Sequence, residues 1–181
     1  MKTQNVITMM MVAAAVLLAG CAAAGGITAP AVADNLRAPA DQVPALEVAA
    51  TGVQIYVCSA GKADPARFEW AFKAPEADLF DHAGTRIGKH YAGPTWESND
   101  GSKVVGEVKA RDDGPDANAI PWLLLKAKSN AGNGVFGHTL SIQRVRTVGG
   151  KAPAAACSEA QAGSEVRVPY TAAYYFYDAR P

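Results

Sequence analysis

Alternation of apolar and polar residues with a period of two is the feature that most restricts the fold of this chain. Residues 53–58 and 67–73 alternate in this way, and both runs are rich in aromatic and β-branched side chains. This pattern is typical of a half-buried β-strand. No long stretch with a period of 3.6 residues follows the first 20 residues. We therefore predict an all-β fold.

Further strand candidates are separated by clusters of Gly, Pro, Asn and Asp. They cover residues 87–92, 95–97, 103–108, 120–127, 140–143 and 166–178. Asn99, Asp100 and Gly101 predict a hairpin turn. The nearly continuous apolar run at 120–127 indicates a strand covered on both faces, although a short helix also fits its period. About eight short strands predict a single antiparallel β-sandwich or a jelly-roll-like barrel.

The first 20 residues have the pattern of a bacterial lipoprotein signal. A basic Lys2 precedes the uncharged residues 6–19, and Leu-Ala-Gly-Cys at 18–21 resembles the lipobox. The apolar run is shorter than the about 20 residues of a membrane span. The resemblance implies lipidation of Cys21, and Ala22 after it implies an outer-membrane anchor that faces the periplasm. Cleavage after Ala24, which would release a soluble secreted or periplasmic protein, is the alternative.

Composition divides the rest of the chain into two parts. Residues 21–42 are rich in Ala, Gly and Pro and are predicted to form a flexible tether that spans roughly 25 Å. Residues 43–181 are predicted to form one β domain behind the signal peptide at 1–20. The chain has 17 basic and 17 acidic residues and no cluster of Lys and Arg, so we expect no nucleic-acid partner.

Two cysteines remain if Cys21 carries lipid. An exported compartment is oxidising, so Cys58 and Cys157 are predicted to form a disulfide. The chain-entropy model gives such a bond, with a loop of about 100 residues, about 4.7 kcal/mol of stabilisation. A catalytic Cys58 is the alternative, which the absence of a neighbouring His weakens.

Five blocks of sequence carry a resemblance to a known family. They are GVQIYVC at 52–58, HYAGPTWE at 90–97 with DGS at 100–102, IPWLL at 120–124, GGKAP at 149–153, and VPY at 168–170 with YYFY at 174–177. Together they resemble the domain of unknown function 3455, which occurs in secreted proteins of bacteria and fungi. The similarity runs from about Val43 to Asp178. It implies an exported, compact domain and brings no activity, cofactor or catalytic residue.

His90 is the centre of the candidate site. On the predicted strand 87–92 its same-face neighbours, Gly88 and Ala92, are small and leave room for an aromatic ring or a ligand. Aromatic side chains offer contact area at low entropic cost. The candidate ligand-binding residues are His90, Tyr91, Trp96, Glu97 and Trp122. The alternative is a structural histidine inside an aromatic core.

Metal and cofactor motifs are weak. GNGVFG at 132–137 satisfies the dinucleotide pattern, but a strand-like run follows it where a helix is required, so it predicts a glycine-rich loop. The spacing of His82 and His90 fits no zinc motif, and the acidic residues at 112–118 predict a solvated turn. We expect no metal and no cofactor.

These observations favour a lipid-anchored, non-enzymatic envelope module that binds a small molecule, a glycan or an envelope protein. The alternative is a small exported hydrolase or isomerase that uses His90 with Glu97 or Asp100, which requires their side chains to converge. A third hypothesis is a rigid spacer domain, which the lack of a concave pocket would favour.

Overall fold

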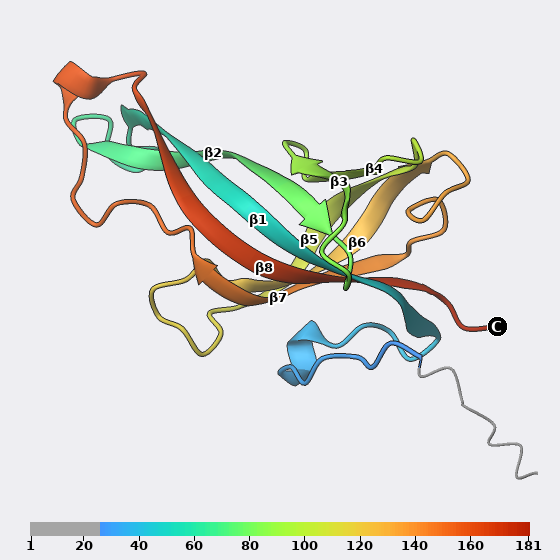
Figure 1. Cartoon of the computed structure of the whole chain (residues 1–181). Helices are drawn as coiled ribbons and strands as arrows, with labels where there is room; N and C mark the ends of the chain where they lie inside the picture. Colours follow the sequence, from blue (N-terminus) through green and yellow to red (C-terminus); the bar gives the residue numbers. More distant parts are fainter. Residues whose placement is uncertain (1–25) are drawn as a thin grey trace, which may run out of the picture.

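The computed structural model describes residues 26–181, and its strands close into one antiparallel barrel (Figure 1). The strands are β1 (Gln42–Ala60), β2 (Phe68–Phe80), β3 (Arg86–Tyr91), β4 (Thr95–Ser98), β5 (Lys103–Asp112), β6 (Trp122–Ala131), β7 (Ser141–Gly149) and β8 (Glu165–Ala179). Two short 3-10 helices, η1 (Asp34–Leu36) and η2 (Glu159–Gln161), complete the fold. The predicted signal at 1–20 and the lipidation of Cys21 lie outside the described residues. Within residues 26–181, no helix is long and apolar enough to cross a membrane.

The strand order is sequential. Each strand pairs with the next one along the chain, and β1 pairs with β8 to close the barrel. The prediction of a single antiparallel all-β domain is confirmed, and the barrel is the alternative that the structure adopts. Its connections are those of a meander and do not cross over as in a jelly roll, because short turns join consecutive strands such as β4 and β5 at Asn99–Gly101.

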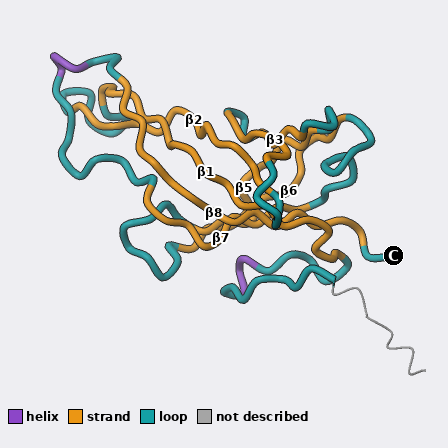
Figure 2. Tube along the Cα trace, viewed as in Figure 1, coloured by secondary structure: helices purple, strands orange, loops and turns teal. Residues whose placement is uncertain are grey.

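Unequal strand lengths leave the barrel wall incomplete at one place. β2 pairs with β3 only over Ala77–Phe80, so its residues 68–76 pair with β1 alone. β5 pairs with β4 only at residues 103–105, so residues 107–112 pair with β6 alone. The short β3–β4 hairpin therefore closes only one end of the space between β2 and β5. Figure 2 shows the long β1 and β8 running side by side along the barrel.

The main core fills the closed end of the barrel. Period two places alternate side chains of each strand inside, as expected for a pleated sheet. The largest buried side chains there come from β2, β4, β6, β7, β8 and the loop after β6; they include Leu79, Trp96, Leu125, Phe136, Ile142, Tyr174 and Phe176.

A second cluster lies on the outer face of β7 and β8. Tyr175 and Tyr177 are buried there with Val145, and Ile27 and Val32 from the N-terminal segment pack against them. All four aromatic residues at 174–177 are consequently buried, because one face of β8 packs in the main core and the other packs in this second cluster.

The segment predicted as a flexible tether is part of the domain where it is described. Leu36 in η1 is fully buried, and its carbonyl oxygen accepts a hydrogen bond from Nε2 of Gln143 at 2.5 Å. Residues 26–42 therefore lie on the barrel, and the prediction is corrected for this stretch. The physical reason is that apolar side chains recur among its Ala and Pro residues and cover the outer face of β7 and β8. Residues 21–25 lie outside the described chain.

The predicted disulfide is confirmed. Cys58 at the end of β1 bonds Cys157 in the loop before β8, with 6.0 Å between the two Cα atoms and 99 residues of sequence separation. The bond ties the open end of the long β1 strand to the loop that connects β7 and β8.

Candidate functional site

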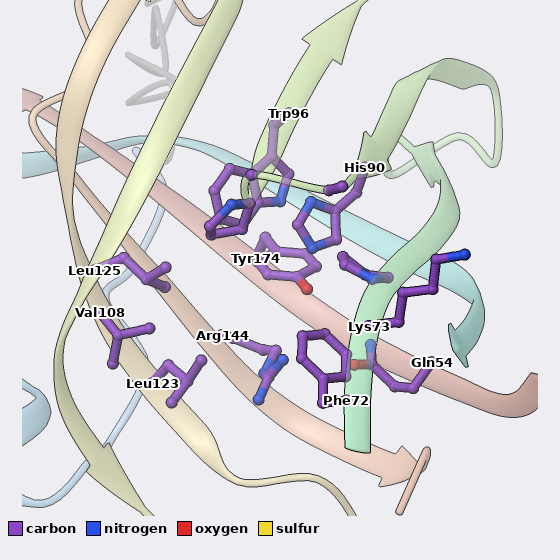
Figure 3. Close-up of a pocket in the computed structure, with 14 residues that line it drawn as sticks. Gln54, Phe72, Lys73, His90, Trp96, Val108, Leu123, Leu125, Arg144 and Tyr174 are labelled. Atoms are coloured by element: carbon purple, nitrogen blue, oxygen red, sulfur yellow. The ribbon is translucent and has the colours of Figure 1, made fainter. Parts of the chain in front are cut away.

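The incomplete part of the barrel wall contains a hollow of about 210 Å³. Figure 3 shows His90 and Trp96 at one end of it, Phe72 on one side, and Val108 and Leu123 on the opposite side. The walls thus come from β2, from the β3–β4 hairpin and from β5 and β6. Because most of these side chains are apolar, the hollow favours an apolar surface over water.

A second hollow of about 460 Å³ continues from the first one. The two share several lining residues, namely Gln54, Phe72, Val108, Leu123 and Arg144. The second extends toward Arg111 and Lys151 at the open end of the barrel. We call the two hollows together the cleft.

Two stacked rings form the closed end of the cleft. His90 and Trp96 are register partners on β3 and β4, and their ring centroids lie 4.3 Å apart at an interplanar angle of 12°. Tyr174 on β8 meets both rings edge-on, with its centroid 5.2 Å from His90. Gly106 on β5 makes room for the indole, because a Cβ atom at that position would lie 2.9 Å from the Trp96 ring.

His90 is held as a neutral ring. Its side chain is 3% exposed, and burial lowers its pKa to about 3. Nδ1 lies 2.8 Å from the carbonyl oxygen of Thr95, which can only accept a hydrogen bond. Nδ1 therefore carries the proton, and Nε2 is left as an acceptor. A neutral ring suits packing and hydrogen bonding better than proton transfer near pH 7.

Arg144 on β7 brings a positive charge into the cleft. Its side chain is half-buried, and Nε and Nη2 donate to the carbonyl oxygen of Pro121 at 3.0 and 2.8 Å. The guanidinium forms no ion pair with any Asp or Glu of residues 26–181. Two other cations of the lining are paired, Lys73 with Glu165 and Arg111 with Asp113.

Three buried polar groups on residues that line the cleft make no hydrogen bond of good geometry within the described chain, although the Tyr174 hydroxyl lies near Tyr170 and Arg144. They are Nε2 of Gln54, Nε1 of Trp96 and the hydroxyl of Tyr174. Burial raises the pKa of Tyr174, while the charge of Arg144 and contacts of the hydroxyl with Tyr170 and Arg144 oppose that shift, so the hydroxyl stays protonated and can donate. Buried polar groups almost always find partners in folded proteins.

Only two of the five predicted binding residues meet at the cleft. His90 and Trp96 line it, whereas Tyr91 and Glu97 lie on the outer face, where the Tyr91 hydroxyl donates to Oε2 of Glu97 at 2.7 Å. That hydrogen bond is the main reason why the pKa of Glu97 is lowered. Trp122 packs on the outer cluster with Tyr175. Adjacent residues of a strand point to opposite faces, which separates these neighbours.

The carboxylates of the enzyme alternative do not converge on His90. Glu97 is on the opposite face of the sheet, as its register with Lys89 requires. Asp100 lies in the β4–β5 turn, where its carboxylate accepts hydrogen bonds from Oγ of Ser102 at 2.6 Å and from the Val135 amide at 2.9 Å. These bonds, above all that from Ser102, lower its pKa to about 2. Asp100 therefore ties the turn to the β6–β7 loop.

The other sequence motifs have structural positions. The glycine-rich residues 132–137 form part of the loop between β6 and β7, as predicted. A Cβ atom on Gly134 would lie 2.2 Å from Oδ2 of Asp100, so a larger residue there would displace the Asp100 carboxylate from its hydrogen bonds. No group of three or more His, Cys, Asp or Glu residues within residues 26–181 is arranged to hold a metal ion.

Sequence reasoning missed the polar side of the cleft. Arg144, Gln54 and Phe72 were not among the predicted site residues, and Tyr174 was noted only as part of an aromatic run. A signal for Arg144 does exist, since it shares the face of Ile142 on an alternating strand and a cation at an inward position is unusual. The apolar run 120–127 could not reveal that Leu123 points inward and Trp122 outward, because both residues are apolar.

A family model described as "Protein of unknown function (DUF3455)" matches residues 39–178 of the chain. No curated protein matches the chain, and no solved structure matches it. The matched range contains every residue that lines the cleft. The comparisons thus identify the family but no activity, and the proposed function rests on the geometry of the cleft.

Proposed function

The chain belongs to the DUF3455 family of proteins of unknown function, and we propose that this member is a non-enzymatic binding module that holds a small molecule in the cleft of its barrel. The observation that carries the proposal is the cleft itself. It combines apolar walls with the half-buried Arg144 guanidinium and with buried polar groups that make no hydrogen bond of good geometry in the described chain. Pockets of this composition are typical of small-molecule sites.

Exposed apolar side chains at the mouth of the cleft support the same function. Phe72 is 56% exposed and Val108 is 50% exposed, and they stand on opposite walls. Exposed apolar groups that border a cavity commonly mark a binding site. A bound molecule would remove both side chains from water, and this burial would contribute to its affinity. A rigid spacer domain has no use for exposed apolar side chains at the mouth of a cleft.

Binding is favoured over catalysis by the state of the polar groups. The one buried histidine of the cleft is neutral and is stacked on Trp96, and the carboxylates proposed for acid–base work lie elsewhere. Among the predicted partners, a small molecule fits better than a glycan or an envelope protein, because the site is a narrow and mostly apolar hollow.

We also propose that the module is exported and anchored to the outer membrane by lipid on Cys21. The support is the lipobox-like sequence at 18–21 and the disulfide, which is typical of oxidising compartments. The anchor would keep the cleft on the periplasmic side of the membrane. Several acyl chains on one cysteine are needed for stable attachment.

The test of ligand binding uses the full chain with Cys21→Ser and an uncharged fluorescent probe, N-phenyl-1-naphthylamine. We expect saturable binding, and we expect Val108→Trp to weaken it at least about tenfold by filling the mouth of the cleft. Val148→Trp is the matched control, since Val148 is similarly exposed and does not line the cleft. No saturable binding, or equal binding by both variants, would contradict the proposal.

A further inference from the structure

The cleft has a charge imbalance that the proposed function alone does not explain. Its lining contains four basic side chains, those of Lys73, Arg111, Arg144 and Lys151, and no Asp or Glu. The whole chain has no net formal charge, so the imbalance arises from where the fold places its charges. A concave surface lined by one sign of charge attracts the opposite sign.

Arg144 is the half-buried cation of the lining that has no ion pair within the described residues. Lys73 and Arg111 form ion pairs with Glu165 and Asp113 at the rim of the cleft. Lys151 donates to the carbonyl oxygen of Ala117 and is exposed to water. Arg144 is half-buried, and within the described residues its guanidinium contacts the Pro121 carbonyl and the Tyr174 hydroxyl but no anion. A partly buried cation without an anion is costly unless a ligand supplies the charge.

The polar atoms around Arg144 are all suited to an acceptor. Nε and Nη2 of Arg144 donate to the Pro121 carbonyl, and the guanidinium lies close enough to the Tyr174 hydroxyl to oppose the rise that burial causes in its pKa. Nε2 of Gln54 is a buried donor on the same hollow that makes no hydrogen bond of good geometry within residues 26–181. Figure 3 shows the guanidinium between Leu123 and Phe72, with the Tyr174 hydroxyl on its side of the cleft. A carboxylate can accept several such bonds at once.

From this geometry, and resting on the proposed function, we infer that the ligand is a small monocarboxylate with an apolar body, and that Arg144 is the residue that binds its carboxylate. One half-buried guanidinium without an ion pair matches one negative charge. A phosphate or a polyanion would need further cations beside it, but Lys73 and Arg111 are already paired and Lys151 is exposed at the open end of the cleft. The apolar body lies along Val108, Leu123 and Phe72 toward the stacked rings. The two hollows of the cleft, of about 210 and about 460 Å³, suit a small molecule.

The test compares acids with their uncharged amides by isothermal titration on the full chain with Cys21→Ser. The probes are phenylacetate and hexanoate, which separate aromatic from aliphatic acids, and phenylacetamide and hexanamide. We expect at least one acid to bind about tenfold or more tightly than its amide, as a charge-assisted hydrogen bond predicts. Arg144→Gln should abolish this preference and Arg144→Lys should keep part of it.

Arg167→Gln is the matched control, because Arg167 is an exposed arginine of β8 that pairs with Glu76 away from the cleft. It should leave the preference for acids unchanged. Circular dichroism and thermal unfolding establish that each variant is folded. If Arg144→Gln does not fold, the preference of Arg144→Lys for acids over amides is measured instead, and it should be weaker than that of the protein with Arg144.

Different results would overturn the carboxylate inference, the role of Arg144 and the proposed function. Equal binding of acids and amides by the unmodified cleft, or a preference that survives Arg144→Gln, overturns the carboxylate inference and leaves the binding function standing. A preference that Arg167→Gln abolishes as well also overturns the role of Arg144. Failure of the acids, the amides and the uncharged probe to bind overturns both the inference and the proposed function.

Discussion

At the scale of single residues, His90 is the group whose burial has the clearest energetic consequence. The imidazole is enclosed by Trp96 and Tyr174, and its pKa is lowered to about 3, against about 6.5 in an unfolded chain. Below the unfolded value, the unfolded chain binds a proton that the folded protein excludes. The free energy of unfolding therefore falls as the pH falls through this window, by at most about 1.4 kcal/mol per pH unit.

We expect the free energy of unfolding to drop by about 2 kcal/mol between about pH 7.5 and about pH 5 as a result of this one group. His90→Gln removes the titration and should flatten the dependence, whatever its effect on stability at pH 7.5. His82→Gln is the control, because His82 is exposed. Urea unfolding at several pH values measures the slopes, and equal slopes for the unmodified protein and His90→Gln would show that His90 is not the source.

At the scale of elements, the N-terminal segment acts as a cover for the outer face of β7 and β8. η1 is only three residues long, so its own hydrogen bonds contribute little, and packing must hold it in place. Leu36, the last residue of η1, is fully buried, and the side-chain amide of Asn35 donates to the carbonyl oxygen of Arg111 on β5 at 3.1 Å. The segment is thus bound by side chains to strands that lie far away in sequence.

Leu36→Ala should lower the free energy of unfolding by about 2–5 kcal/mol, because it removes buried methyl groups and leaves a cavity. Leu140→Ala, at an exposed leucine of the loop before β7, should cost less than about 1 kcal/mol. Chemical unfolding compares the two variants. If Leu36→Ala were as mild as the control, the segment would be only loosely attached to the barrel.

At the scale of the whole molecule, one covalent bond limits how far the barrel can open. The disulfide of Cys58 with Cys157 closes a loop of 99 residues that contains most of the strands. The double variant Cys58→Ser/Cys157→Ser should lose about 2–5 kcal/mol of stability, chiefly because its unfolded state gains freedom. Thermal and urea unfolding under oxidising conditions measure the difference, and a loss well below this range would contradict the expectation.

Cys21→Ser separates the anchor from this bond. It should leave the unfolding of the domain unchanged, while it abolishes incorporation of labelled palmitate and releases the protein from the membrane fraction. Labelling that persists in Cys21→Ser would contradict the proposed lipid anchor. Unequal unfolding of Cys21→Ser and the unmodified chain would show instead that the anchor region contributes to the stability of the barrel.

Much of the architecture was predictable because its signals are local. Period-two alternation, the Asn-Asp-Gly turn and the pair of cysteines predicted strands, a hairpin and a disulfide, and all three are present. That His90 lies beside a hollow was predictable for the same reason, since its small neighbours on one face imply space. The tether was predicted wrongly within residues 26–42, because its apolar side chains are too sparse to show a period.

The sequence by itself determined the class of fold, the disulfide and the family. It also indicated His90 and Trp96, two of the three rings at the closed end of the cleft. The tertiary structure decided the closure into a meander barrel, the gap between β2 and β5, and the meeting of Arg144, Gln54 and Tyr174 from β7, β1 and β8. The physical reason is that alternation shows which residues share a face of one strand. It cannot show which strands face each other across a barrel, because that depends on register and strand length summed around the closed sheet.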